Sequence, residues 1–162
     1  MSTVLAVGEV EVDSWVDAAP FRTYLRHLMA LGEVSPGCVA LLAGIRPRLA
    51  LHLLHGRRGR ALRKISADSG RLLLDVTPDL VLAVRSRQVP ARTTARHLNQ
   101  LLNEEWSLPE LAELLGVTSA EVARLASGAV RSCSQLVALR AAAEVALAHS
   151  PSFPGITLKQ AA

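Results

Sequence analysis

The 162-residue chain has few aromatic side chains, two cysteines and no long apolar run. Aromatic residues make up 3% of it, so we expect aliphatic side chains to fill the core. Cys38 and Cys133 lack the spacing of metal ligands, and we interpret both as small core residues in a reducing compartment. No run approaches transmembrane length and no secretory signal pattern is present. We therefore expect a cytoplasmic protein without membrane contact.

Motifs of catalysis and of cofactor binding are also missing. The sequence has no glycine-rich phosphate loop, no nucleophile motif and no paired carboxylates that indicate a cleft, so we expect neither an enzyme nor a cofactor. His52 and His55 are three residues apart, which suits a metal site on a helix. No Cys, Asp or Glu lies nearby in the sequence to complete such a site, so we predict no bound metal.

Half of the residues are hydrophobic, which indicates a globular protein with one core or two small ones. The net charge is +4, and the excess is uneven. Residues 1–88 hold 12 basic and 8 acidic side chains, whereas residues 89–162 hold 6 of each. A basic first half favours an acidic partner such as nucleic acid.

Residues 35–64 carry the clearest pattern. A capping residue followed by proline is typical of a helix start, and it occurs at Ser35-Pro36 and again at Arg46-Pro47. Gly44 between them suits a tight turn. The sequence therefore predicts two helices joined by a turn. We expect their shared core to contain Val39, Ala43, Ile45, Ala50 and Leu53.

Cations fill the outer face of the second of these helices and the segment after it. From residue 46 to residue 64 there are seven Lys or Arg and no Asp or Glu. The residues predicted to face outward on the helix are Arg46, Arg48, His52 and His55. The predicted basic arm contains Arg57, Arg58, Arg60, Arg63 and Lys64. A docked helix with a cationic flank is what binding in a DNA major groove requires. Whether Arg46 and Arg48 read bases or grip phosphates stays open.

The second half repeats the first. Gly44 and Gly116 are 72 residues apart, and the same offset separates Ser35 from Ser107 and Gly56 from Gly128. A repeat of this length indicates two copies of one small domain. In the second copy the pattern that begins at Thr118 predicts a capping box.

The periodicity predicts further helices over about residues 17–32, 66–74, 77–85, 94–102 and 132–148. We expect an N-terminal arm or strand over 1–14, a first helix-turn-helix domain over 15–87 and a second over 88–149. We also expect a linker over 86–92 and a flexible tail over 150–162. The residues predicted to close the first core are Leu72, Leu73, Val76, Leu80 and Val84.

With these motifs in order, the chain resembles the tandem helix-turn-helix DNA-binding proteins of actinobacteria and their phages. The matching segments are WVDAAPFRTYLRHLMALG and GRRGRALRKISADSGRLLLDVTP, then VPARTTARHLNQLL and EEWSLPELAELLGVTSAEVARLASG. The resemblance covers about residues 15–148 and implies an all-α fold and a transcriptional regulator. By position, it implies that Ser35 and residues 46–55 face the groove and that residues 57–64 grip the DNA backbone.

The second copy departs from this pattern. It has GAVRSCS where the first has GRRGRALRK, and the first has one extra residue before Ser35. Its recognition positions are Thr118, Ser119, Ala120, Ala123 and Arg124, of which only Arg124 is charged. The acidic residues near its entry helices are Glu104, Glu105, Glu110 and Glu113. Weak DNA contact and a scaffold or protein-contact role therefore both stay open.

We expect sequence-specific double-stranded DNA binding, as a repressor or another regulator associated with the nucleoid. This prediction is compatible with a homodimer on a palindrome and with a monomer on an asymmetric site. One alternative is an adaptor that holds a protein partner, such as polymerase, a toxin or a phage or host factor, through the second domain. Another is a nucleoid-type binder without sequence preference.

Overall fold

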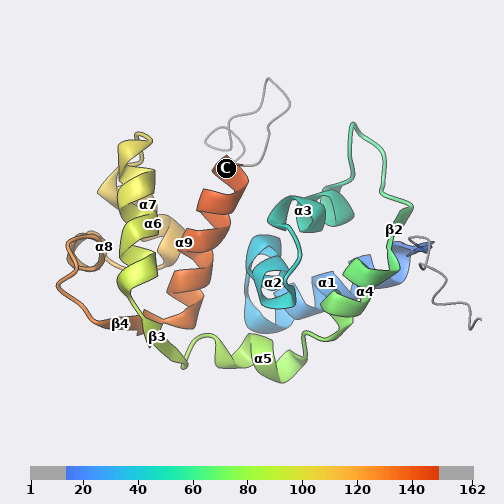
Figure 1. The fold of residues 1–162 in the computed structure, drawn as a ribbon, viewed down its shortest axis with the longest axis horizontal. Coiled ribbons are helices and arrows are strands. Elements are labelled where there is room, and N and C mark those ends of the chain that lie inside the picture. The colour runs from blue at the N-terminus through green and yellow to red at the C-terminus, as the bar shows by residue number, and fades with distance from the viewer. Residues whose placement is uncertain (1–13, 150–162) are drawn as a thin grey trace, which may run out of the picture.

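The computed structural model describes residues 14–149, and they are predominantly helical (Figure 1). In this range nine helices and four short strands follow one another, and the strands form two antiparallel pairs. The predicted all-α class is confirmed. The predicted tail over 150–162, and all of the predicted N-terminal arm except Ser14, lie outside the described residues. Among residues 14–149 no helix combines the length and the apolar character needed to cross a membrane.

The first half runs from β1 to α5. Its elements are β1 (Trp15–Asp17), α1 (Ala19–Gly32), α2 (Pro36–Ala43), α3 (Pro47–His55), β2 (Lys64–Ser66), α4 (Ala67–Leu74) and α5 (Pro78–Ala83). β1 and β2 are antiparallel, with Val16 opposite Ile65. The pairing joins the segment before α1 to the segment before α4.

The second half repeats the order of the first six of these elements. It contains β3 (Gln88–Pro90), α6 (Arg92–Asn103), α7 (Leu108–Leu115), α8 (Ser119–Ala126), β4 (Ser132–Ser134) and α9 (Gln135–Ala148). The backbone pairing repeats too, because the Ala18 N–H donates to the Arg63 carbonyl and the Ala91 N–H donates to the Arg131 carbonyl. The internal repeat thus extends from the sequence to the backbone hydrogen bonds.

Side-chain caps begin the helices at the predicted positions. The Ser35, Ser66 and Thr77 hydroxyls accept N–H groups at the starts of α2, α4 and α5. The predicted capping box is present, because the Thr118 hydroxyl accepts the Glu121 N–H and the Glu121 carboxylate accepts the Thr118 N–H. The predicted turn glycines, Gly44 and Gly116, have φ of 80° and 70°, the left-handed conformation in which glycine avoids a steric cost.

Three details of the predicted elements and core are wrong. The expected linker over 86–92 contains β3, and the expected helix start at Ser132 is instead β4, which pairs with it. These strands are three residues long and exist through a long-range partner, so helical periodicity does not reveal them. Leu72 and Leu80, expected in the core, are 40% and 41% exposed.

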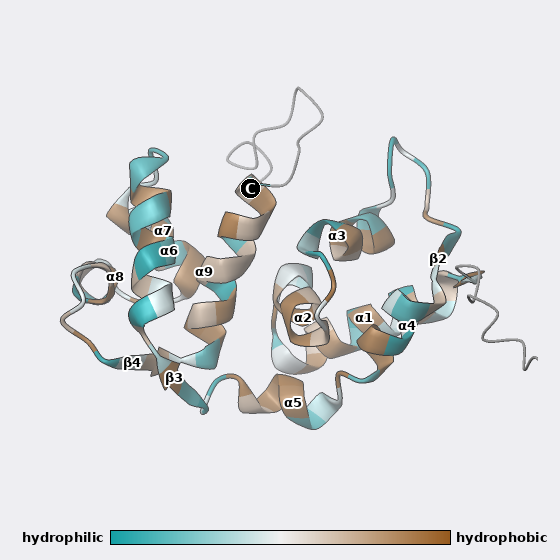
Figure 2. Cartoon of the chain, in the orientation of Figure 1, coloured by the Kyte–Doolittle hydropathy of each residue, from teal (hydrophilic) through white to brown (hydrophobic). Residues whose placement is uncertain are grey.

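Two clusters of buried side chains form the core, and α9 belongs to both. Leu136 of α9 packs in the first-half cluster, whereas Val137 and Ala141 pack in the second-half cluster. α2 contacts α1, α3 and α4 within its own half and α9 of the other half. Figure 2 shows few hydrophilic residues on α2. A helix that is apolar on all sides needs such a cover, and α9 supplies the part that the first half lacks.

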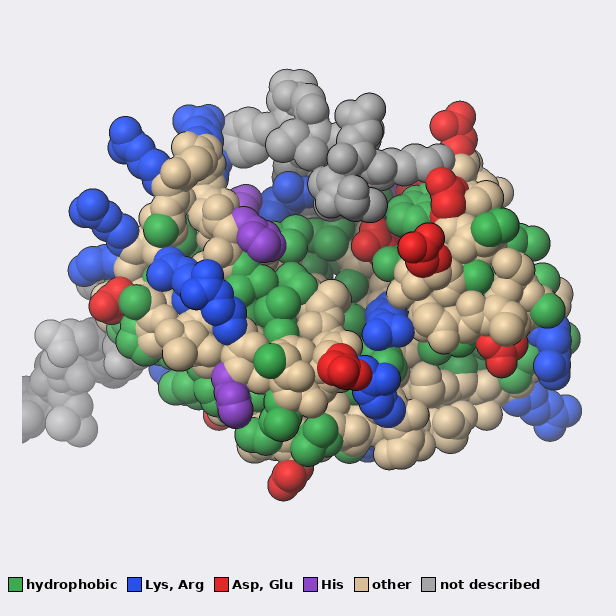
Figure 3. Space-filling model, turned by 180° about the vertical axis from the view of Figure 1, so that it is seen from behind, with side chains coloured by type: hydrophobic (Ala, Val, Ile, Leu, Met, Phe, Trp, Pro, Cys, Tyr) green, Lys and Arg blue, Asp and Glu red, His purple; other side chains and the backbone are tan. Residues whose placement is uncertain are grey.

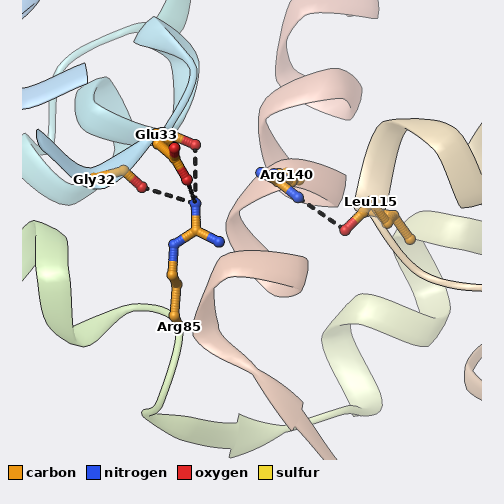
Figure 4. Close-up of polar contacts among 5 residues, drawn as sticks. All are labelled: Gly32, Glu33, Arg85, Leu115 and Arg140. Carbon is orange, nitrogen blue, oxygen red and sulfur yellow. Dashed lines mark hydrogen bonds and ion pairs between the residues drawn. The ribbon is translucent and has the colours of Figure 1, made fainter. Parts of the chain in front are cut away.

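Two arginines hold helix ends (Figure 4). Arg85 donates from Nη2 to the Gly32 carbonyl at 3.0 Å and lies 3.2 Å from the Glu33 carboxylate, at the C-terminal end of α1. Arg140 of α9 donates from Nη1 to the Leu115 carbonyl of α7 at 2.9 Å. The last carbonyls of a helix carry partial negative charge and lack helical partners, so these guanidinium groups stabilise both ends.

Candidate nucleic-acid interface

α3 packs on the first core through its three buried residues, and Leu49 and Leu54 are partly buried against the same cluster. Pro47, Ala50 and Leu53 are buried, whereas Arg46 before the helix and His55 at its end are exposed. The spacing of three residues between the buried positions places them on one side of the helix. Arg46 and His55 therefore face outward, as the sequence predicts.

Arg48 does not face outward as predicted. Its Nη2 donates to the Leu147 carbonyl of α9 at 3.3 Å, and the side chain is partly buried. Its Nε atom is buried without a hydrogen-bond partner among the described residues. The sequence could not show this, because the acceptor lies 99 residues away on the other half of the chain. We therefore assign Arg48 to the contact between the halves and not to the outward face.

His52 is half-buried beside two arginines. Burial lowers the pKa of His52 below its ordinary value of 6.5, and the charges of Arg57 and Arg48 lower it further. At pH 7 the imidazole is therefore neutral. It can donate or accept a hydrogen bond but adds no positive charge to this surface.

The predicted basic arm is a tight hairpin at the C-terminal end of α3. The Arg57 N–H donates to the Arg60 carbonyl at 2.8 Å, and the Arg60 N–H donates back to the Arg57 carbonyl at 3.1 Å. Arg58 and Gly59 between them have φ of 53° and 73°, the combination of a two-residue type I′ turn. We call residues 56–63 the basic hairpin.

Gly56 and Arg22 fix the base of the basic hairpin. Gly56 has φ of 78°, and a Cβ atom there would lie 2.2 Å from the Arg60 carbonyl oxygen, so only glycine fits without a shift of the backbone. Arg22 of α1 donates from Nε to the Leu53 carbonyl at 2.7 Å and from Nη2 to the Leu62 carbonyl at 2.5 Å. One guanidinium thus joins the end of α3 to the returning strand of the hairpin. Sequence reasoning missed Arg22, because nothing local distinguishes it from a surface arginine.

The basic hairpin is an insertion relative to the second half. Gly56 and Gly128 both have positive φ, and Arg63 and Arg131 make equivalent backbone bonds. Removing the four residues RRGR after Gly56 leaves GALRKIS, which aligns with GAVRSCS after Gly128. The second half therefore keeps the scaffold of this connection without its cationic tip.

Figure 3 shows where charged side chains gather on one face of the molecule. The exposed cations of the hairpin and its base are Arg57, Arg58, Arg60, Arg63 and Lys64. In Figure 3 Lys and Arg side chains gather at the upper left, the end from which the hairpin projects in Figure 1, and Asp and Glu side chains gather at the upper right. The five cations of the hairpin and its base are thus all exposed and gathered at one end of the molecule, as expected from the sequence.

The helix starts of the two halves differ in charge. α2 and α3 have no acidic residue in their first turn, whereas α7 begins with Glu110 and α8 with Glu121. Both glutamates accept the backbone N–H of their own N-cap residue, Ser107 or Thr118. A carboxylate there occupies the amide groups that would otherwise attract a phosphate.

The remaining predicted site residues are caps or surface positions. Ser35 is exposed, but its hydroxyl accepts the Cys38 N–H at 3.3 Å and donates to Cys38 Sγ at 3.2 Å. Burial raises the pKa of the Cys38 thiol. Thr118 caps α8, Ser119 is half-buried in its first turn, and Arg124 is exposed on it. The structure thus gathers the hairpin cations and Arg46 in the first half and leaves the three second-half positions apart from them.

Among residues 14–149 no three His, Cys, Asp or Glu side chains come together as ligands for a metal.

Comparison of the chain with protein-family models, with curated proteins and with solved structures found no match. The functional interpretation therefore rests on the sequence motifs, the charges and the geometry of this chain.

Proposed function

We propose that this protein is a sequence-specific double-stranded DNA-binding transcriptional regulator that acts as a repressor. The observation that carries the proposal is the acid-free cationic surface made by Arg46, the exposed side of α3 and the basic hairpin. A helix start without acidic residues, next to a fixed group of arginines, suits a polyanion with a groove. The resemblance to tandem helix-turn-helix proteins supports the same function.

The length of α3 favours separate roles for α3 and the hairpin in DNA binding. α3 has nine residues and is therefore about 13.5 Å long, similar to the width of a DNA major groove, about 12 Å. With the start of α3 at the base edges, its C-terminal end reaches the phosphates that border the groove. The hairpin begins at that end, so its arginines meet phosphates and release counterions.

Base reading falls to the exposed side of α3. Arg46 can make the bidentate contact to guanine that is the commonest specific contact in the major groove. His52 and His55 can hydrogen-bond to base edges or phosphates. Arg48 is excluded from this list because its guanidinium is engaged with α9. Repression then follows from occupying DNA that polymerase needs.

The second half suits a supporting role. Its recognition positions include one cation, and a glutamate lies in the first turn of both α7 and α8. It attaches to the first half through α9, which contacts α2 and α3. The specific alternative is an adaptor whose second half holds a protein partner.

The test is selection of bound sites from a random duplex library at about 150 mM salt, where non-specific binding is weak. We expect an enriched motif with one strongly specified segment. Binding without an enriched motif would indicate a nucleoid-type binder. No binding at any salt concentration would reject DNA and leave the adaptor as the function to test by pull-down.

Two variants separate base reading from phosphate contact. Arg46→Ala should relax the preference at one base position by about 1–3 kcal/mol. Arg60→Ala should weaken binding to all sequences equally and lower the salt dependence. Arg71→Ala is the matched control, since Arg71 is an exposed arginine of the same half that pairs with Asp68 on α4. Its binding should equal that of the unaltered protein.

A further inference from the structure

A pocket of about 490 Å³ lies between the turn that joins α2 to α3, the first turns of α3, and α4. Its lining residues are Gly44, Ile45, Arg46, Arg48, Leu49, His52, Ser69 and Leu72. This volume is within the range of small-molecule sites. None of the functions above requires a pocket here, because a groove-binding helix needs only its outer face.

The lining combines apolar and cationic groups. Ile45, Leu49 and Leu72 supply the apolar surface, while Arg46 and Arg48 supply positive charge. α3 also begins here, and its N-cap residue Arg46 provides no side-chain cap for the first N–H groups. The partial positive charge of a helix start adds to that of the arginines. The pocket thus favours a ligand with an anionic head and an apolar body.

One polar group beside the pocket lacks an acceptor. Arg48 Nε is buried and unpaired among the described residues, while Nη2 of the same guanidinium is bound to Leu147. An unsatisfied donor on a charged group is costly. Because Nε is buried, a ligand in the pocket does not reach this atom, and Arg48 acts on such a ligand through its positive charge.

The second half shows the same place filled. Leu72 and Arg140 each lie six residues after the serine that caps their helix, Ser66 or Ser134. Arg140 reaches across to the α7–α8 turn, where it binds the Leu115 carbonyl (Figure 4) and lies 2.9 Å from where a Cβ atom of Gly116 would be. In the first half the shorter, apolar Leu72 leaves the equivalent turn at Gly44 open. The pocket therefore arises from a specific difference between the copies.

We propose that this pocket binds a small amphipathic carboxylate, with its head at the start of α3 and its apolar chain against Ile45, Leu49 and Leu72. Binding is weak, in the range of about 0.1–1 mM, because the pocket is open and a ligand keeps part of its surface in water. Arg46 and His52 belong both to the pocket and to the proposed DNA surface. Resting on the proposed function, we further infer that the carboxylate and DNA compete.

The test is titration of the full chain with octanoate, acetate and octanol, followed through amide NMR shifts. Octanoate should give saturable shifts at Gly44, Leu49 and Ser69, with acetate and octanol at least about tenfold weaker, since each lacks one half of the ligand. The proposal is overturned if octanoate does not saturate below about 10 mM, if octanol binds equally well, or if the shifts cluster away from the pocket.

Leu72→Arg supplies a blocking variant, because it places an arginine where the second half has Arg140. Leu74→Arg is the matched control, since Leu74 is an exposed leucine of α4 that does not line the pocket. Octanoate binding should be lost in Leu72→Arg and kept in Leu74→Arg, and loss in both or in neither rejects the site. On a duplex obtained from the site selection, octanoate should weaken DNA binding by the unaltered protein and by the Leu74→Arg variant. It should not weaken DNA binding by the Leu72→Arg variant. If the protein binds no DNA, the NMR titration still decides the pocket.

Discussion

At the scale of single residues, the candidate surface depends on backbone conformations that most residues avoid. Three of the four residues from Gly56 to Gly59 have positive φ, and Arg58 adopts it in spite of its Cβ atom. An L-residue in this region costs roughly 1–2 kcal/mol. Surrounding contacts, among them the bonds from Arg22 to the Leu53 and Leu62 carbonyls, hold the turn in place.

The two hairpin glycines should respond differently to alanine. Gly56→Ala adds both a positive-φ cost and a clash with the Arg60 carbonyl, so we expect it to lower the free energy of unfolding by more than about 2 kcal/mol. Gly59→Ala meets nothing within 4 Å and should cost about 1 kcal/mol. Urea denaturation measures both. Equal losses in the two variants would contradict the close approach at Gly56.

At the scale of elements, a four-residue insertion distinguishes two otherwise similar units. The two halves share turn glycines and strand pairing, and their connections after the third helix differ in length. The first has RRGR at a hairpin tip, and the second passes directly from Gly128 to Ala129. A connection on the surface can change in this way without disturbing the core beneath it.

Deletion of residues 57–60 should therefore leave a folded protein. We expect the unfolding midpoint to change little, because the remaining connection matches the one that the second half uses. DNA affinity at about 150 mM salt should fall by at least about tenfold, and the slope of affinity against salt should decrease by about three, one for each arginine removed. Fluorescence anisotropy over a salt series measures this. An unchanged slope in a folded deletion variant would show that the tip makes no phosphate contact.

At the scale of the whole molecule, α9 makes the two halves interdependent. It contributes to both buried clusters, and its approach to α2 is close, since a Cβ atom on Gly37 would lie 3.0 Å from the Ala143 Cβ. Small residues at this crossing allow that approach. The α2–α3 unit that carries the proposed DNA surface therefore packs against a helix that belongs, by sequence, to the second repeat.

The two tryptophans report on this dependence, because Trp15 lies in β1 and Trp106 packs against the second cluster. In the Trp106→Phe variant the remaining Trp15 reports unfolding of the first half. In the Trp15→Phe variant the remaining Trp106 reports unfolding of the second half. We expect their urea transitions to coincide. In both backgrounds Ala143→Leu should overpack the crossing, cost about 1–3 kcal/mol and separate the transitions.

The control for this experiment is Ala148→Leu, at the exposed end of α9, which should leave the transitions coincident. Separate transitions with Ala143 intact would show that the halves unfold independently despite sharing α9.

The sequence by itself determined the helical class, most helix starts, the two turn glycines and the repeat. These features depend on local physics, since a serine cap, a proline in the first turn and a glycine with positive φ act within a few residues. The position of the cationic segment was also predictable, because charge density is a property of composition. Its compact hairpin form was not predicted.

Only the tertiary structure decided which contacts are made by side chains whose position the sequence left open. Arg48 turned toward α9, Arg22 became the anchor of the hairpin, and Leu72 came to line a pocket instead of a core. β3 formed in a presumed linker because β4, more than 40 residues later, supplied its hydrogen-bond partners. Each outcome depends on a partner distant in sequence, and periodicity, capping and charge patterns carry no information about such partners.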